Sequence, residues 1–142
     1  MKKTLGLLLL STIILLTGCG IIEETRKTIH YATETTDFIN ELSAFSVEVQ
    51  SIMNNGEVNV TSIEEKLLDI ENTIAEFNSI EAPAIAEGIH NEILIQNEKL
   101  LDTINKIQSG ELMIEDLNKT DFTQSIDNIT KFMDQIQNLE NN

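Results

Sequence analysis

The sequence contains few of the residues that interrupt helices or cross-link a chain. Its 142 residues include one proline, six glycines, one cysteine, six aromatic residues and no tryptophan. A β-sandwich needs many turns, so this scarcity of proline and glycine argues against one and favours long helices. A single cysteine excludes both an intramolecular disulfide and a zinc site built from several thiolates.

Basic residues are also scarce. Nine Lys and Arg residues stand against 24 Asp and Glu residues, giving a formal net charge of −15. This balance argues against a nucleic-acid partner, which requires a basic face, and against a domain that lies flat on anionic lipid. We interpret the acidic excess as a solvated surface, which leaves basic partners or cations as the electrostatically allowed ligands.

The N-terminus follows the plan of a secretory signal. Lys2 and Lys3 precede an apolar run over residues 5–16. A transmembrane helix needs about 20 apolar residues, so the run predicts a signal peptide rather than the alternative, a retained membrane helix.

The apolar run ends in Leu16-Thr17-Gly18-Cys19, which resembles a bacterial lipobox. The resemblance implies that signal peptidase II cuts between Gly18 and Cys19 and that diacylglycerol is attached to the Cys19 thiol. Two acyl chains suffice for stable anchoring, so we expect a protein anchored by lipid at the extracytoplasmic face of the cell membrane. Cleavage would leave seven basic and 24 acidic residues, a net charge of −17.

Beyond Cys19, apolar residues repeat with the alternating four- and three-residue spacing of bundle-forming helices. The spacing predicts helices over about residues 38–53, 62–78, 83–108 and 121–139, with a turn or short helix over 111–119. The predicted seams are Phe38, Leu42, Phe45, Val49 and Ile52; Ile63, Leu67, Ile70, Ile74 and Phe77; Ile85, Ile89, Ile93, Leu100, Ile104 and Ile107; and Phe122, Ile126, Ile129, Met133 and Ile136.

These helices predict an all-α fold, an up-down antiparallel bundle of three to four helices after an N-terminal lipoprotein signal helix. We assign residues 1–18 to the signal, 19–37 to the lipidated N-terminus and a tether or the start of the first helix, and 38–142 to the bundle. Residues 20–37 carry only a thin stripe, so both a packed helix and a flexible stalk remain open. A three-helix bundle with the first helix apart and an extended coiled-coil hairpin are alternatives, although short loops favour a compact bundle.

That thin stripe consists of Ile22, Ile29 and Thr36, spaced by seven residues, with Thr25 and Ala32 between them. In the third helix, Gly88 lowers helix stability; the close crossing of another helix would explain it, and so would chance.

Catalytic motifs are not visible in the sequence. The two histidines, His30 and His90, are interpreted as solvated or packing residues, since neither belongs to an HExxH motif. Glu87 and His90 match the Glu-x-x-His pattern of bundle metal sites once, but a paired site needs a second copy. We therefore expect no catalytic residue, no metal site and no cofactor, and a protein that is not an enzyme.

Three segments together resemble a known family. They are the stretch from Phe77 to His90, Tyr31-Ala32-Thr33-Glu34, and Asn97-Glu98-Lys99-Leu100-Leu101. They resemble a family of small uncharacterised lipoproteins of low-GC Gram-positive bacteria, classed as a domain of unknown function. The resemblance implies a membrane-anchored extracytoplasmic protein and supplies no activity and no site residues.

Two functional hypotheses follow. The first is a non-enzymatic module that binds an as yet unknown envelope protein through the groove near Pro83–His90. Four small residues lie in or beside this range: Ala82, Ala84, Ala86 and Gly88. Small residues let a partner approach, or else they let the helices of the bundle pack closely. The second hypothesis is a cation- or small-ligand-binding bundle, motivated by the acidic faces and the Glu87/His90 pair.

Overall fold

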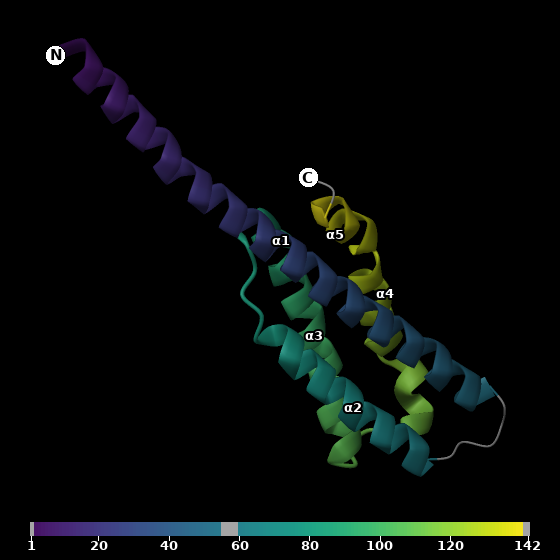
Figure 1. Ribbon diagram of the computed structural model, residues 1–142. Helices are drawn as coiled ribbons and strands as arrows, with labels where there is room; N and C mark the ends of the chain where they lie inside the picture. Colours follow the sequence, from purple (N-terminus) through teal and green to yellow (C-terminus); the bar gives the residue numbers. More distant parts are fainter. Residues whose placement is uncertain (1, 55–59, 141–142) are drawn as a thin grey trace.

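The computed structural model describes residues 2–54 and 60–140, and the side chains of 22–53, 61–117 and 120–139. All regular elements in these ranges are helical, which confirms the all-α prediction (Figure 1). In chain order they are α1 (Lys2–Asn54), α2 (Val60–Asn78), the 3-10 helix η1 (Ala84–Ala86), α3 (Glu87–Gln108), the 3-10 helix η2 (Ile114–Lys119), α4 (Phe122–Thr130) and α5 (Met133–Glu140).

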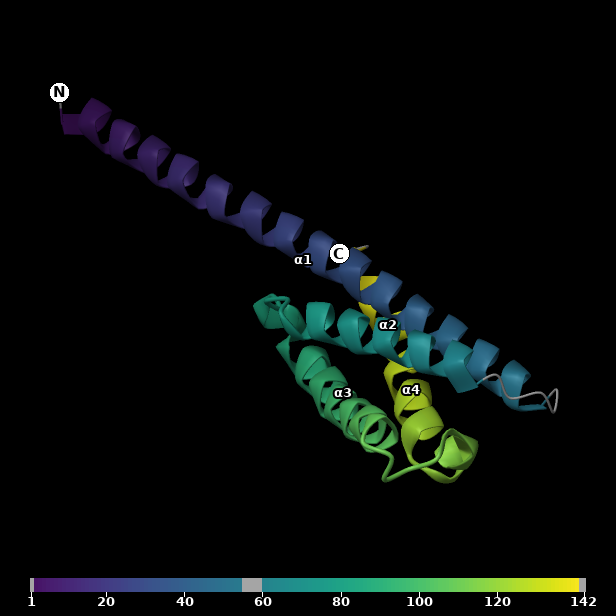
Figure 2. The same ribbon diagram turned by 90° about the horizontal axis from the view of Figure 1, so that it is seen from below.

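The helices form an up-down antiparallel bundle, as predicted. α3 and α4 lie on the same side of the pair formed by α1 and α2 (Figure 2). α4 packs against α3 and α1, and α5 then runs back along α1 (Figure 1). The link between the first two predicted helices includes residues 55–59, which lie outside the described residues. Within the described residues, no helix combines the length and the apolar character that crossing a membrane requires.

The core consists largely of the predicted seams. In α2 all five seam residues are buried, and in α1 and α4 the seam residues Phe38, Leu42 and Phe122 are at most 4% exposed. Ile85 is the clear exception, because its side chain is 64% exposed. It lies in η1, and a 3-10 turn has three residues per turn, so Ile85 leaves the stripe that the α-helical period predicts.

The start of the third helix differs from the prediction. Pro83 is not in the first turn of a continuous helix; its extended backbone caps η1, and the Ala86 N–H donates to its carbonyl over 2.8 Å. The predicted close crossing at Gly88 is wrong, since a Cβ atom there would meet nothing within 4 Å. The predicted end of this helix is confirmed by Gly110, whose φ of 76° favours glycine.

The predicted last helix is wrong as a single element, because the chain turns between α4 and α5. The Phe132 N–H donates to the Ile129 carbonyl over 3.0 Å, which tightens the turn. The Thr130 hydroxyl donates back to the Ile126 carbonyl over 3.0 Å, a bond of the kind that bends helices. The bend allows the chain to leave α3, which α4 contacts, and to follow α1.

Residues 20–37 form a helix as part of α1, but the predicted stripe within them is buried only in its second half. Ala32 is buried as predicted and Thr36 is half-buried, whereas Thr25 is exposed. Ile22 and Ile29 are 64% and 44% exposed, whereas Tyr31, Ala32 and Thr35 are at most 1% exposed. α1 therefore enters the core at Tyr31, and the helix before this residue extends beyond the bundle (Figure 1).

Candidate functional site

A buried cluster that contains His90 lies where α1, α2 and α3 meet. The Phe38 ring of α1 stacks on the Phe77 ring of α2, with 4.2 Å between centroids. The His90 imidazole of α3 lies 5.2 Å from Phe77 and 5.7 Å from Tyr31, between centroids. The Tyr31 hydroxyl and His90 Nδ1 are 3.3 Å apart and share a hydrogen bond. We call Tyr31, Phe38, Phe77 and His90 the histidine cluster.

Burial governs the protonation of this cluster. His90 is 8% exposed and Tyr31 is 1% exposed. Burial lowers the pKa of His90 below its usual 6.5 and raises the pKa of Tyr31 above 10.0, because both charged forms lose hydration. A neutral His90 accepts the Tyr31 hydroxyl hydrogen at Nδ1 when the ring carries its own hydrogen at Nε2. The cluster thus supports packing between three helices and leaves little of the imidazole accessible to a substrate.

A second polar contact lies beside the histidine cluster. Asn97 is fully buried on α3, and its amide nitrogen donates to the Asn78 side-chain oxygen over 2.8 Å. The Asn97 side-chain oxygen has no hydrogen-bond partner in the structure. A buried polar group without a partner is costly. The bond from the Asn97 nitrogen to Asn78 therefore favours one position of α3 against the end of α2.

The other predicted metal-site candidates are not brought together. His30 is exposed on α1, where Nε2 lies 3.7 Å from a Glu34 oxygen. Within the described residues Glu87 forms no ion pair with His90, and no three His, Cys, Asp or Glu side chains are arranged to hold a metal ion.

An open groove lies where α1 leaves the bundle. One wall is the start of α1 and the other is the connection after α2, which lies beside α1 (Figure 1). The groove has a volume of about 760 Å³. Its lining residues are Ile22, Glu23, Arg26, Lys27, His30, Tyr31, Ser79, Ile80 and Glu81. We call it the N-terminal groove; it combines apolar side chains with both signs of charge.

Arg26 and Lys27 differ from the other described basic residues. Neither has an ion-pair partner among the described residues. By contrast, Lys66, Lys99, Lys106 and Lys131 each donate a hydrogen bond or ion pair to a nearby side chain. Arg26 and Lys27 are thus two exposed cations of the N-terminal groove that no described side chain engages, and they are available to an outside anion.

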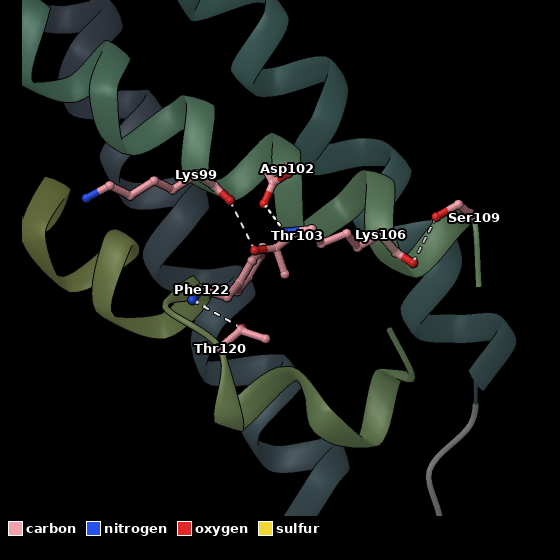
Figure 3. A network of polar contacts seen from close by, with 7 residues as sticks. All are labelled: Lys99, Asp102, Thr103, Lys106, Ser109, Thr120 and Phe122. Atoms are coloured by element: carbon pink, nitrogen blue, oxygen red, sulfur yellow. Dashed lines mark hydrogen bonds and ion pairs between the residues drawn. The ribbon is translucent and has the colours of Figure 1, made fainter. Parts of the chain in front are cut away.

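A second groove lies between α3 and the start of α4, and its basic residues are engaged internally. Lys106 Nζ lies 2.6 Å from an Asp102 oxygen, which raises the pKa of Lys106 (Figure 3). The Thr103 hydroxyl donates to the Lys99 carbonyl over 3.0 Å, and the Phe122 N–H donates to Thr120 Oγ1 over 3.2 Å. The bonds of Thr103 and Lys106 lie within α3, and the Phe122 bond lies at the start of α4. Lys99 and Lys106 therefore form a pair of basic residues for comparison with Arg26 and Lys27.

The predicted cleavage and lipidation site lies on α1. The backbone of Gly18 and Cys19 is helical, and their side chains lie outside the described side chains. Lipidation of Cys19 and cleavage before it therefore stay predictions from the sequence.

Sequence reasoning gave no role to Tyr31, Asn97, Arg26 or Lys27. Tyr31 carried a signal that was available, because counting back from Phe38 with three- and four-residue steps reaches Thr35 and then Tyr31. The groove carried none, since its walls come from segments about fifty residues apart.

Comparison with known proteins places the bundle in a family. The model of a family of unknown function, DUF6376, matches residues 31–139. The chain belongs to this family. The DUF6376 match begins at Tyr31, the residue at which α1 enters the core. It confirms the resemblance, and the three segments on which that resemblance rested meet around the histidine cluster and Asn97.

A curated relative is similar over most of both chains. This protein of Bacillus subtilis (strain 168), named "Uncharacterized lipoprotein YybP", is 28% identical over 130 residues, which cover 86% of this chain and 87% of the relative. No solved structure matches the chain.

Proposed function

We propose that this DUF6376 protein is a lipoprotein, anchored at the extracytoplasmic face of the cell membrane by diacylglycerol on Cys19. In this proposal the bundle is a non-enzymatic module that binds a protein of the cell envelope. The observation that carries the proposal is the form of α1, which runs unbroken from Cys19 to the bundle and exposes Ile22 to His30, apart from the half-buried Thr28. The lipobox-like Leu16-Thr17-Gly18-Cys19 and the lipoprotein name of the relative support the anchor.

The surroundings of the two histidines support a binding role rather than a catalytic one. His90 is enclosed by aromatic side chains and bonded to Tyr31, so it is poorly placed to exchange a proton with a substrate. His30 stands on the exposed side of α1 with only Glu34 near it. A catalytic base needs an orienting partner and a site for the reacting atom, and neither histidine offers both.

Side-chain exposure supports a smaller contact face within the proposed range Pro83–His90. Pro83, Ala86 and His90 are buried, so they belong to the bundle. Ala84, Ile85 and Gly88 are exposed on the surface beside η1. We therefore place the envelope contact on Ala84, Ile85 and Gly88.

The anchor is tested by metabolic labelling of cells with an alkyne analogue of palmitate. We expect label on the wild-type chain and none on the Cys19→Ala chain. Label that persists on Cys19→Ala, or a wild-type chain without label, would contradict the anchor.

The binding role is tested by crosslinking and mass spectrometry on intact cells. We expect a reproducible envelope partner with the wild-type chain, and its loss with Ala84→Gln, a change at an exposed site that leaves the fold intact. Ala86→Gln is the matched comparison, since Ala86 is fully buried and its replacement should unfold the domain. A partner set that is unchanged by Ala84→Gln contradicts the assigned face.

A further inference from the structure

The basic residues next to the anchor site lie in a part of the mature chain that has no acidic excess. Residues 19–30 carry two acidic and two basic residues, whereas residues 31–142 carry 22 acidic and five basic residues. The whole net charge of −17 therefore belongs to the bundle and its C-terminal end. An anionic surface would repel the bundle but would not repel the start of α1.

The helix sets these two parts at different heights above a membrane that holds Cys19. With a rise of 1.5 Å per residue, Ile22 lies about 4 Å, Arg26 about 10 Å and Tyr31 about 18 Å along the helix from Cys19. The polar layer on one side of a bilayer is about 5–8 Å thick, and long basic side chains can reach back toward it. Along α1 the acidic part begins at Tyr31, about two Debye lengths from Cys19 at physiological salt, so the repulsion of the carboxylates beyond it is largely screened. Glu81, which lines the N-terminal groove, is the bundle carboxylate that stays near the surface.

The N-terminal groove lies at the end of the bundle nearest Cys19, and its side chains are of the kinds that bind a lipid surface. Ile22 is 64% exposed on the α1 wall, and Ile80 lines the opposite side. Arg26 and Lys27 lie on the same wall as Ile22 and have no ion-pair partner among the described residues. Glu23 and Glu81 also line the groove, so the match to an anionic phospholipid rests on the apolar side chain near the glycerol region and on the reach of Arg26 and Lys27 to phosphate level, not on the net charge of the groove.

We propose that the N-terminal groove docks on anionic phospholipid headgroups of the membrane that holds the anchor, with Arg26 and Lys27 binding the phosphates. This inference rests on the proposed anchor at Cys19. Docking fixes the orientation of the bundle, because the groove contains both the start of α1 and the Ser79–Glu81 connection of the bundle. The exposed face at Ala84 and Ile85 follows that connection directly and is held at a defined height.

The chain has no tryptophan, so a single introduced one reports its own surroundings. We would place it by Ser79→Trp, at an exposed position on the bundle side of the groove, and by Met113→Trp, beyond the other end of α3. The full chain would be held by its N-terminal region on vesicles of phosphatidylcholine with or without phosphatidylglycerol. Quenching by aqueous acrylamide and by brominated lipid would be measured.

With Ser79→Trp we expect less acrylamide quenching and more quenching by brominated lipid when phosphatidylglycerol is present. Met113→Trp should respond equally on both vesicles. Each basic residue near an anionic surface is worth about fivefold in binding, so Arg26→Gln with Lys27→Gln should lower the ratio of docked to undocked chains about 30-fold. The matched control, Lys99→Gln with Lys106→Gln, makes the same change of charge and should keep docking.

Equal quenching on both vesicles would overturn the proposal. An equal loss of docking with the Lys99/Lys106 pair would also overturn it, because the effect would then be one of total charge. Mass spectrometry of the N-terminal peptide separates the anchor from the groove. If the Cys19 thiol is free, the proposed anchor fails; coupling this sole thiol to a maleimide phospholipid then holds the chain, and the same comparison decides the groove.

Discussion

The two parts of α1, residues 22–30 and residues 31–53, share one continuous backbone but have different surroundings. Before Tyr31 nearly every described side chain is exposed, and acidic and basic residues balance. From Tyr31 onward a buried seam faces α2, α4 and α5. Helical structure alone therefore does not define the domain. The domain begins at Tyr31, where α1 first packs against other helices.

The largest expected difference between the two parts of α1 comes from removing the same side chain in each. Ile39→Ala removes a fully buried side chain and should lower the free energy of unfolding by about 2–5 kcal/mol. Ile29→Ala, at a position 44% exposed, should change it by less than about 0.5 kcal/mol. Urea unfolding followed by circular dichroism measures the free energy of unfolding of both variants. Equal losses would contradict a domain boundary at Tyr31.

The boundary residue itself should give a smaller effect. Tyr31→Phe keeps the packing of the ring and removes the hydroxyl that lies 3.3 Å from His90 Nδ1. We expect a loss of about 1 kcal/mol, because the buried nitrogen then lacks its partner. A Tyr31→Phe chain that is as stable as the wild type at pH 7 would show that the ring alone holds α1 at this point.

The histidine cluster should make the packed part sensitive to pH. Burial lowers the pKa of His90 below 6.5, so the unfolded chain takes up the proton more readily than the folded chain. The stability that depends on neutral His90 is fully present above about pH 6.5 and is lost as the pH falls toward the lower folded-state pKa. Urea midpoints measured from about pH 7.5 to about pH 5 should fall less steeply for His90→Gln than for wild type.

His30 provides the control, because its side chain is 72% exposed on the other part of α1. His30→Gln makes the same substitution outside the histidine cluster. If His30→Gln flattens the curve and His90→Gln does not, the assignment of the pH dependence to the cluster is wrong.

A small effect should also come from breaking an ion pair on the packed part. Lys66 Nζ lies 2.7 Å from a Glu48 oxygen, with the Glu48 side chain 51% exposed. Lys66→Met should lower the stability by less than about 1 kcal/mol, since exposed pairs are screened by water and salt. Lys106→Met, which breaks the exposed pair with Asp102 within α3, should behave alike. A loss comparable to that of Ile39→Ala would show that charge, and not packing, separates the two parts of α1.

Much of the fold could be predicted because seams depend on the helical period alone. Phe38, Leu42 and Phe45 are buried as their spacing predicts. The same rule failed for residues 22–36, where the choice of Ile22 and Ile29 ignored the register that Phe38 sets. Apolar character misled there, because a buried Thr35, bonded to the Tyr31 carbonyl over 2.7 Å, occupies the seam.

The candidate site could not be predicted in the same way. His90 and Tyr31 are 59 residues apart, and their contact depends on how α1 and α3 are rotated about their axes. The bend after Thr130 was also hidden, since neither proline nor glycine marks it and its hydroxyl bond follows the geometry of the turn. Exposure of Ile85 depends on a 3-10 turn that Pro83 starts, which the sequence alone assigned to α3.

The unbroken course of α1 across residues 18 and 19 has a consequence for maturation. In the uncut chain Glu23 and Glu24 lie in mid-helix, where the helix dipole has no end to attract them. A cut before Cys19 creates a new helix start one turn ahead of them and leaves its first N–H groups without acceptors. Negative charge near such a positive end stabilises a helix by about 0.3 kcal/mol or more per residue. After such a cut, Glu23 and Glu24 would stabilise the new N-terminal end of α1 through their negative charge.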